Sequence, residues 1–132
     1  MTSPSQGTLP IIAKLFLISG AVSACASVVF SAAFAHLPVF SAGVPAVVQT
    51  ALTQQQFHSL GLVGVGLSIV RLGASRWLIS SGWLMLAGLF LFSFNLYARY
   101  VFGIDTFRVA VPWGGGAWIL AWLLAAVGFA RR

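Results

Sequence analysis

The fold of this chain is decided by residues 15–70, which read LFLISGAVSACASVVFSAAFAHLPVFSAGVPAVVQTALTQQQFHSLGLVGVGLSIV. No charged side chain occurs anywhere in this stretch. It is long enough to cross a bilayer twice, because one helical crossing of about 30 Å of hydrocarbon takes roughly 20 residues. Pro38 and Pro45 interrupt it near the middle. The stretch therefore predicts two helices, at about residues 11–34 and 44–70, joined by a short turn.

Two more uncharged runs follow, from Trp77 to Ala98 and from Val109 to Ala130. Backbone groups in lipid must be hydrogen-bonded internally, so we expect these runs to be helices at about 77–98 and 110–130. Four such runs leave no amphipathic helix to cover them in water. The predicted fold class is all-α, an integral membrane four-helix bundle.

The composition also indicates that lipid surrounds most of the chain. Hydrophobic residues make up 60% of the 132 residues and charged residues 6%, and the mean hydropathy is +1.01. A soluble domain carries about 25% charged residues. We expect a flexible N-terminal tail at residues 1–10 and a single membrane domain at residues 11–132. The net charge of +6 does not indicate nucleic-acid binding, because the seven cations occur singly or in pairs and form no basic stripe.

The distribution of Lys and Arg predicts the orientation. Four crossings place both termini on the same side as the connection between the second and third helices. That side carries five cations: Lys14, Arg71, Arg76, Arg131 and Arg132. The other side carries Arg99 and Arg108, with Asp105 between them. By the positive-inside rule both termini are predicted to be cytoplasmic.

Small residues predict how the first two helices pack. The first helix repeats serine at a spacing of four, and the second has small residues at similar spacing. The residues concerned are Ser19, Ser23, Ser27 and Ser31 in the first helix, and Gly61 and Gly64 in the second. Such residues allow helices to approach closely, so we expect these two faces to meet. The alternative is that serine and glycine are simply tolerated by lipid.

Polar side chains inside the membrane gather at the end opposite the termini. Segments from three predicted helices contribute to this candidate cluster: His36, Gln54, Gln55, His58, Asn95, Tyr97 and Arg99. Polar groups at membrane depth are costly and often functional. The cluster is therefore the candidate functional site, although the same groups could serve only to tie the helices together.

Four short motifs in these segments resemble those of one family. They are SAAFAH at 31–36, QTALTQQQFHSL at 49–60, FSFNLY at 92–97 and VPWGG at 111–115. Their order and spacing resemble the transmembrane protein 256 family, also called domain of unknown function 423, over about residues 15–130. Phe34 and Phe94 stand where the family usually has glycine, and Gln54 where it usually has tyrosine. The resemblance implies a small four-helix membrane protein and implies no activity.

Several functions remain to be weighed. We expect a structural or accessory component of a membrane complex. Trp118 and Trp122 are a candidate apolar contact stripe for it, and the favoured alternative is that these two rings contact lipid. The alternative is a small-solute or ion channel or transporter that acts as an oligomer. An enzyme is not expected, because no carboxylate accompanies the histidines. Axial haem ligation by His36 and His58 is likewise disfavoured, since no carboxylate accompanies these histidines to orient their rings.

We expect no catalytic, cofactor-binding or metal-binding residues, although bound lipid is compatible with the sequence. The expected partners are membrane lipids and a membrane-protein complex or further copies of the chain, and not nucleic acid. The positive-inside bias and the family resemblance favour the bacterial inner membrane.

Overall fold

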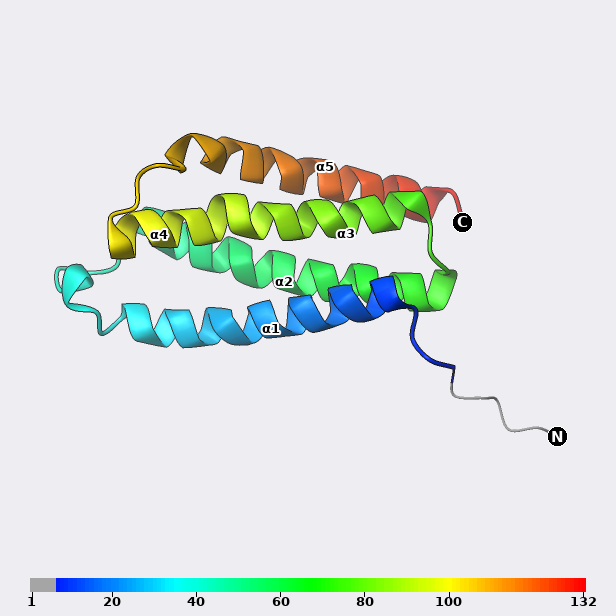
Figure 1. Cartoon of the computed structure of the whole chain (residues 1–132), viewed down its shortest axis with the longest axis horizontal. Coiled ribbons are helices and arrows are strands. Elements are labelled where there is room, and N and C mark those ends of the chain that lie inside the picture. The colour runs from blue at the N-terminus through cyan, green and yellow to red at the C-terminus, as the bar shows by residue number, and fades with distance from the viewer. Residues whose placement is uncertain (1–6) are drawn as a thin grey trace.

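The computed structural model describes residues 7–132 and is entirely helical in its regular structure over that range. Four long helical rods run side by side along the longest axis of the molecule (Figure 1). Of the predicted tail, residues 7–10 have no regular secondary structure, and residues 1–6 lie outside the described range. The membrane four-helix bundle expected from the sequence is confirmed.

The helix bounds lie close to the predicted ones, with one extension. The helices are α1 (Ile11–Phe34), α2 (Ala46–Leu72), α3 (Arg76–Gly88), α4 (Asn95–Phe102) and α5 (Val111–Ala130). A π-helical segment, Leu89–Phe94, joins α3 to α4 into one continuous rod, and 3-10 turns occur at Pro38–Phe40 and Arg108–Ala110. The third rod therefore ends four residues beyond the predicted position at Ala98.

Local signals explain most of these boundaries. Pro10 precedes α1 in an extended conformation, and proline lacks the N–H that a helix start leaves unused. Ser75 caps α3, since its hydroxyl oxygen accepts a hydrogen bond from the Leu78 N–H at 3.2 Å. Gly103 follows α4 with a φ of 69°, the left-handed conformation that commonly ends a helix.

The π-helical segment was not predicted. Its sequence, LFLFSF, contains no proline or glycine and is typical of an ordinary apolar helix. Helix α5 approaches this segment closely at Gly114, where an added Cβ would lie 2.7 Å from the Phe92 backbone nitrogen. Single π-helical turns inside α-helices are rare and occur often at functional sites.

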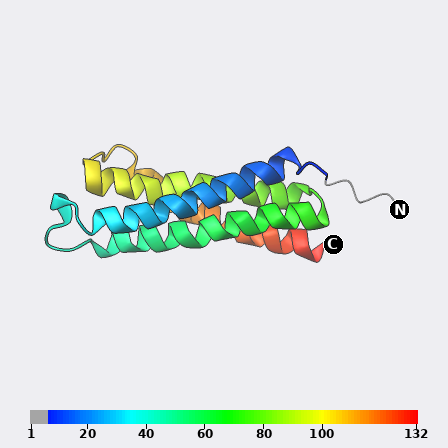
Figure 2. The same ribbon diagram turned by 90° about the horizontal axis from the view of Figure 1, so that it is seen from below.

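The helices form two hairpins that pack against each other. Helix α1 packs along α2, and the α3–α4 rod packs along α5. Helix α2 also contacts the α3–α4 rod, which lies between α2 and α5 in the view of Figure 1. Figure 2 shows α1 and α2 running side by side along the length of the bundle. Two hydrophobic clusters fill the interior, one centred on Phe16, Leu62 and Met85 and the other on Phe34, Val48 and Tyr97.

Three of the four rods in residues 7–132 are individually long and apolar enough to cross a membrane. They are Ile11–Phe34, Arg76–Phe102 and Arg108–Ala130. Helix α2 has comparable length but carries polar side chains over residues 49–59. It packs against α1 and against the α3–α4 rod. Its buried residues include Gln55, His58 and Ser59. The bundle therefore covers part of the polar surface of α2.

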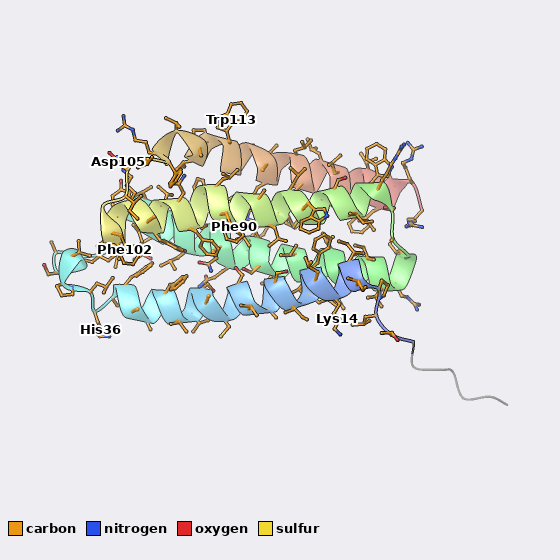
Figure 3. All side chains as sticks on the ribbon, viewed as in Figure 1. Lys14, His36, Phe90, Phe102, Asp105 and Trp113 are labelled. Atoms are coloured by element: carbon orange, nitrogen blue, oxygen red, sulfur yellow. The ribbon has the colours of Figure 1, made fainter. Side chains whose placement is uncertain are left out.

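Both ends of the described chain lie at the same end of the bundle as the α2–α3 connection (Figure 1). Lys14 lies at this end, whereas His36 and Asp105 lie at the opposite end (Figure 3). The two ends of the bundle thus carry the unequal charges on which the orientation was based. The cytoplasmic location of the termini stays a prediction.

The serine face of α1 does lie against α2 at its middle. Ser23 and Ser27 are 7% and 1% exposed. Gly20 lies so close to α2 that an added Cβ would be 2.8 Å from the Ser59 carbonyl oxygen. Ser19 is half-buried and bonds the Leu15 carbonyl of its own helix, and Ser31 is exposed. The contact with α2 therefore uses the middle of the serine row.

The prediction that Gly61 and Gly64 meet α1 is wrong. An added Cβ at Gly61 would lie 2.9 Å from the Trp122 ring of α5, and one at Gly64 would have no neighbour within 4 Å. The face of α2 turned to α1 contains Ser59 and Gly66 instead. The reason is helical phase, because two residues along a helix turn the side chain by about 200°.

Candidate functional site

Gln55 lies at the centre of a polar network that joins three helices. Its side chain is fully buried on α2. Its Nε2 donates to the Ser23 carbonyl oxygen of α1 at 3.0 Å, and the Tyr97 hydroxyl of α4 donates to its Oε1 at 2.7 Å. Both polar atoms of the amide are thus bonded to other helices.

Ser59 extends this network by one helical turn. Its Oγ lies 2.6 Å from the Gln55 carbonyl oxygen and 2.7 Å from Ser23 Oγ. A carbonyl can only accept, and a hydroxyl has one proton to donate. Ser59 therefore donates to Gln55, and the Ser23 hydroxyl donates to Ser59. The residues of this Gln55 network are Ser23, Gln55, Ser59 and Tyr97.

His58 belongs to a second network, which joins α2 to α5. Its Nδ1 lies 2.9 Å from the Gln54 carbonyl oxygen, and Trp122 Nε1 donates to its Nε2 at 3.1 Å. An indole N–H can only donate, so Nε2 accepts and the proton of the neutral ring is on Nδ1. His58 also stacks on Trp118, with ring centroids 3.9 Å apart and planes 5° apart.

Trp118 is an interior residue and not part of a surface stripe. It is 4% exposed, and its Nε1 donates to the Met85 carbonyl oxygen of α3 at 3.1 Å. Trp122 is 39% exposed. The prediction that these two tryptophans form one contact stripe is therefore wrong, because the Trp118 side chain is buried and links α5 to α3.

A groove of about 380 Å³ lies beside the second network. It is lined by α2, α5 and the π-helical segment, and its lining residues include Thr50, Gln54, Phe57, Phe92 and Trp118. The lining is largely apolar. A second groove, which shares Phe57 and Trp122 with the first, lies further along α2 and is lined by Gly61 and Gly64. Chemically the first groove suits an apolar chain, such as a lipid tail or the side chains of a neighbouring helix.

The remaining members of the predicted cluster lie apart from these networks. His36 is exposed beyond the end of α1 (Figure 3). Asn95 donates through Nδ2 to the Phe107 carbonyl oxygen at 2.6 Å, which ties α4 to the connection before α5. Arg99 pairs with Asp105, with 3.3 Å between Nε and Oδ1. The single predicted cluster is thus two interior networks, two separate contacts at the end of the bundle and the exposed His36.

Several hydrogen-bonding residues of the interior were missing from the predicted site. The Ser93 hydroxyl donates to the Ala51 carbonyl oxygen at 2.8 Å, and the Ser81 hydroxyl donates to the Ala121 carbonyl oxygen at 2.7 Å. Ser59 could have been found, since it lies four residues after Gln55 on the same helical face. Ser81 gave no such signal, because its partner is a backbone group forty residues away in sequence.

No group of three metal-ligating side chains gathers anywhere in residues 7–132. His58 could bind a metal through Nε2 only by losing the hydrogen bond from Trp122. The arrangement described here binds helices to one another. It offers an apolar groove, and the buried side chains of residues 7–132 all have hydrogen-bond partners for their polar atoms.

The fold and these networks define a small multi-pass helical membrane protein. Residues 31–115 match a family described as "Protein of unknown function (DUF423)". The chain belongs to this family, and the family resemblance noted in the sequence is confirmed.

Related proteins extend over most of the chain. A UPF0382 membrane protein of Bacillus subtilis, YwdK, is 33% identical over 118 residues, which cover 86% of this chain and 94% of the relative. The UPF0382 inner membrane protein YgdD of Escherichia coli K12 is 29% identical over 120 residues, covering 89% of this chain and 91% of the relative. No solved structure matches the chain. Together with the apolar helices, these relatives place the chain in the bacterial inner membrane.

Proposed function

We propose that this protein is a structural or accessory component of a membrane complex and not an enzyme. The observation that carries the proposal is the use of its interior polar groups. Both polar atoms of the Gln55 amide are hydrogen-bonded, one to α1 and one to α4. Both ring nitrogens of His58 are hydrogen-bonded as well, one to α2 and one to α5. Groups committed in this way stabilise one packing of the bundle and leave little capacity for proton transfer to a substrate.

The exposed surface supports a partner within the membrane. Large apolar side chains project from several helices, including Phe57 at 56% exposure, Ile119 at 68% and Trp113 at 75%. The connections between the helices are short. A partner protein would therefore meet this chain mainly along its apolar helix faces. The same faces could also join further copies of the chain.

Purification of the full chain at native expression, in a gentle detergent or nanodiscs, tests the proposal. We expect a membrane protein to co-elute in a fixed ratio and to be identified by mass spectrometry. Recovery of the chain alone would count against an accessory role. Recovery as a pure homo-oligomer would favour the pore alternative, which ion-flux measurements in liposomes would then examine.

Two matched glycine variants identify the face that contacts a partner. Gly64 lines the second groove, beside α5, whereas Gly116 lies on the exposed side of α5. An added Cβ would have no neighbour within 4 Å at either position. Gly64→Leu and Gly116→Leu should therefore both fold. Loss of the co-eluting protein in only one of them assigns the contact to that face.

A further inference from the structure

Arg76 lies far in sequence from Arg131 and Arg132, yet all three side chains converge at the α2–α3 end of the bundle. Arg76 begins α3, and its guanidinium carbon lies 5.0 Å from the centroid of the Trp77 ring. Arg131 follows α5, and its guanidinium carbon lies 5.6 Å from the same ring. Arg132 donates to the Gly73 carbonyl oxygen, between α2 and α3, at 2.7 Å. We call Arg76, Trp77, Arg131 and Arg132 the arginine–tryptophan site.

This site has no acidic side chain to balance it. Asp105 is the single acidic residue of the chain. In the described range the one ion pair joins it to Arg99, at the other end of the bundle. Two guanidinium groups thus lie on one indole ring, and an anion bound beside them gains Coulomb attraction from both.

The surroundings favour a phosphate group as that anion. Guanidinium groups bind phosphate oxygens through paired N–H donors. The first turn of α3 begins at Arg76, and the N–H groups of a first helical turn add positive potential. The site therefore combines two kinds of phosphate-binding donor.

The position of Trp77 indicates that the phosphate belongs to a lipid. Trp77 is half-buried in the first turn of a membrane-spanning rod. Indole rings at helix ends lie at the head-group level of the bilayer. Basic pockets between transmembrane helices at this level bind the head groups of anionic lipids.

We propose that the arginine–tryptophan site binds the phosphate of an anionic phospholipid. The lipid head group bridges the start of α3 and the end of α5, and its acyl chains lie along the apolar helix faces below. This proposal does not depend on an accessory role, because the lipid would be bound whether or not a partner protein is present.

The test is a lipid titration of the purified full chain followed by native mass spectrometry. Phosphatidylglycerol and phosphatidylcholine are compared as added lipids, and inorganic phosphate is added as a competitor. We expect phosphatidylglycerol to bind more tightly than phosphatidylcholine. The double variant Arg76→Gln/Arg131→Gln should weaken phosphatidylglycerol binding by about 30-fold, and each single variant by about fivefold.

The matched control is Lys14→Gln/Arg108→Gln, which removes the same net charge from side chains that are not part of the arginine–tryptophan site. Both of these side chains are exposed. The control should bind phosphatidylglycerol nearly as well as the unaltered protein. An equal loss in both double variants would overturn the proposal, since only net charge would then matter. Equal binding of phosphatidylcholine, or full competition by millimolar phosphate, would overturn it as well.

The single variants keep the test decisive if the double variant does not fold. Arg76 and Arg131 are exposed, so their replacement removes no buried contact. Gel filtration and circular dichroism establish that each variant is folded before its lipid binding is measured.

Discussion

Replacing Gln55 tests whether the polar network on α2 stabilises the bundle. The Gln55→Met variant keeps an unbranched side chain and removes the bonds to Ser23 and Tyr97, at 3.0 and 2.7 Å. Interhelical hydrogen bonds in membranes contribute roughly 0.6 kcal/mol on average. The two lost bonds should lower the free energy of unfolding by about 1.2 kcal/mol, roughly an eightfold change in the equilibrium constant.

A double-mutant cycle with Tyr97→Phe isolates the shared bond. Each single variant leaves the other polar group without its partner, whereas the double variant removes both groups. The expected coupling is about 1 kcal/mol, between the membrane-protein average of roughly 0.6 and the largest values near 1.7. We expect a coupling free energy above the average because Gln55 is fully buried and its Oε1 lies close to the Tyr97 hydroxyl.

Unfolding in mixed micelles with increasing SDS, followed by tryptophan fluorescence, gives these free energies. Thr53→Val provides the control, because the Thr53 hydroxyl is exposed and bonds the Gln49 carbonyl of its own helix. Combined with Gln55→Met it should show no coupling. A Gln55–Tyr97 coupling below about 0.3 kcal/mol, the limit within which independent sites add, would refute the network as a source of stability.

Two further pairs of variants test the packing. Gly114→Ala should lower the free energy of unfolding by about 1–3 kcal/mol because its Cβ would lie 2.7 Å from the Phe92 backbone nitrogen. Gly116→Ala, with open space around it, should raise the free energy by up to about 1 kcal/mol in the same SDS titration, and a reversed order would contradict the close approach. Ser27→Leu should reduce the folded yield in detergent, since Ser27 is only 1% exposed, whereas Gly64→Leu should leave the yield unchanged. Equal losses of yield in this second pair would show that Gly64 is packed.

The membrane location of the chain could be predicted because it depends on local composition. Each apolar run is as long as one bilayer crossing, and each interruption carries proline, glycine or charge. The start of α1 at Ile11 and the end of α5 at Ala130 agree with the predicted bounds. The π-helical segment could not be predicted, because LFLFSF has the same local preferences as an α-helical turn. The segment lies where α5 packs against the rod, and this contact is not visible in the local sequence.

The candidate site could be predicted only as a set of polar residue types. Gln55, His58 and Tyr97 were all singled out as polar groups at membrane depth. The sequence does not say that Gln55 and Tyr97 face each other while His58, three residues from Gln55, faces α5. Side chains three residues apart differ by about 60° around a helix, and that difference separates the two networks.

The sequence alone determined that this protein lies in a lipid bilayer, how many long helices it has and that both termini lie on the same side. These properties follow from the hydrocarbon thickness and from counting crossings, and neither requires knowledge of which helices touch. Only the tertiary structure decided which residues meet. Helical phase turned Gly61 and Gly64 away from α1, and the antiparallel packing of α3 and α5 brought Arg131 to Trp77. Contacts of this kind depend on the rotation and order of whole helices, which many distant side chains set together.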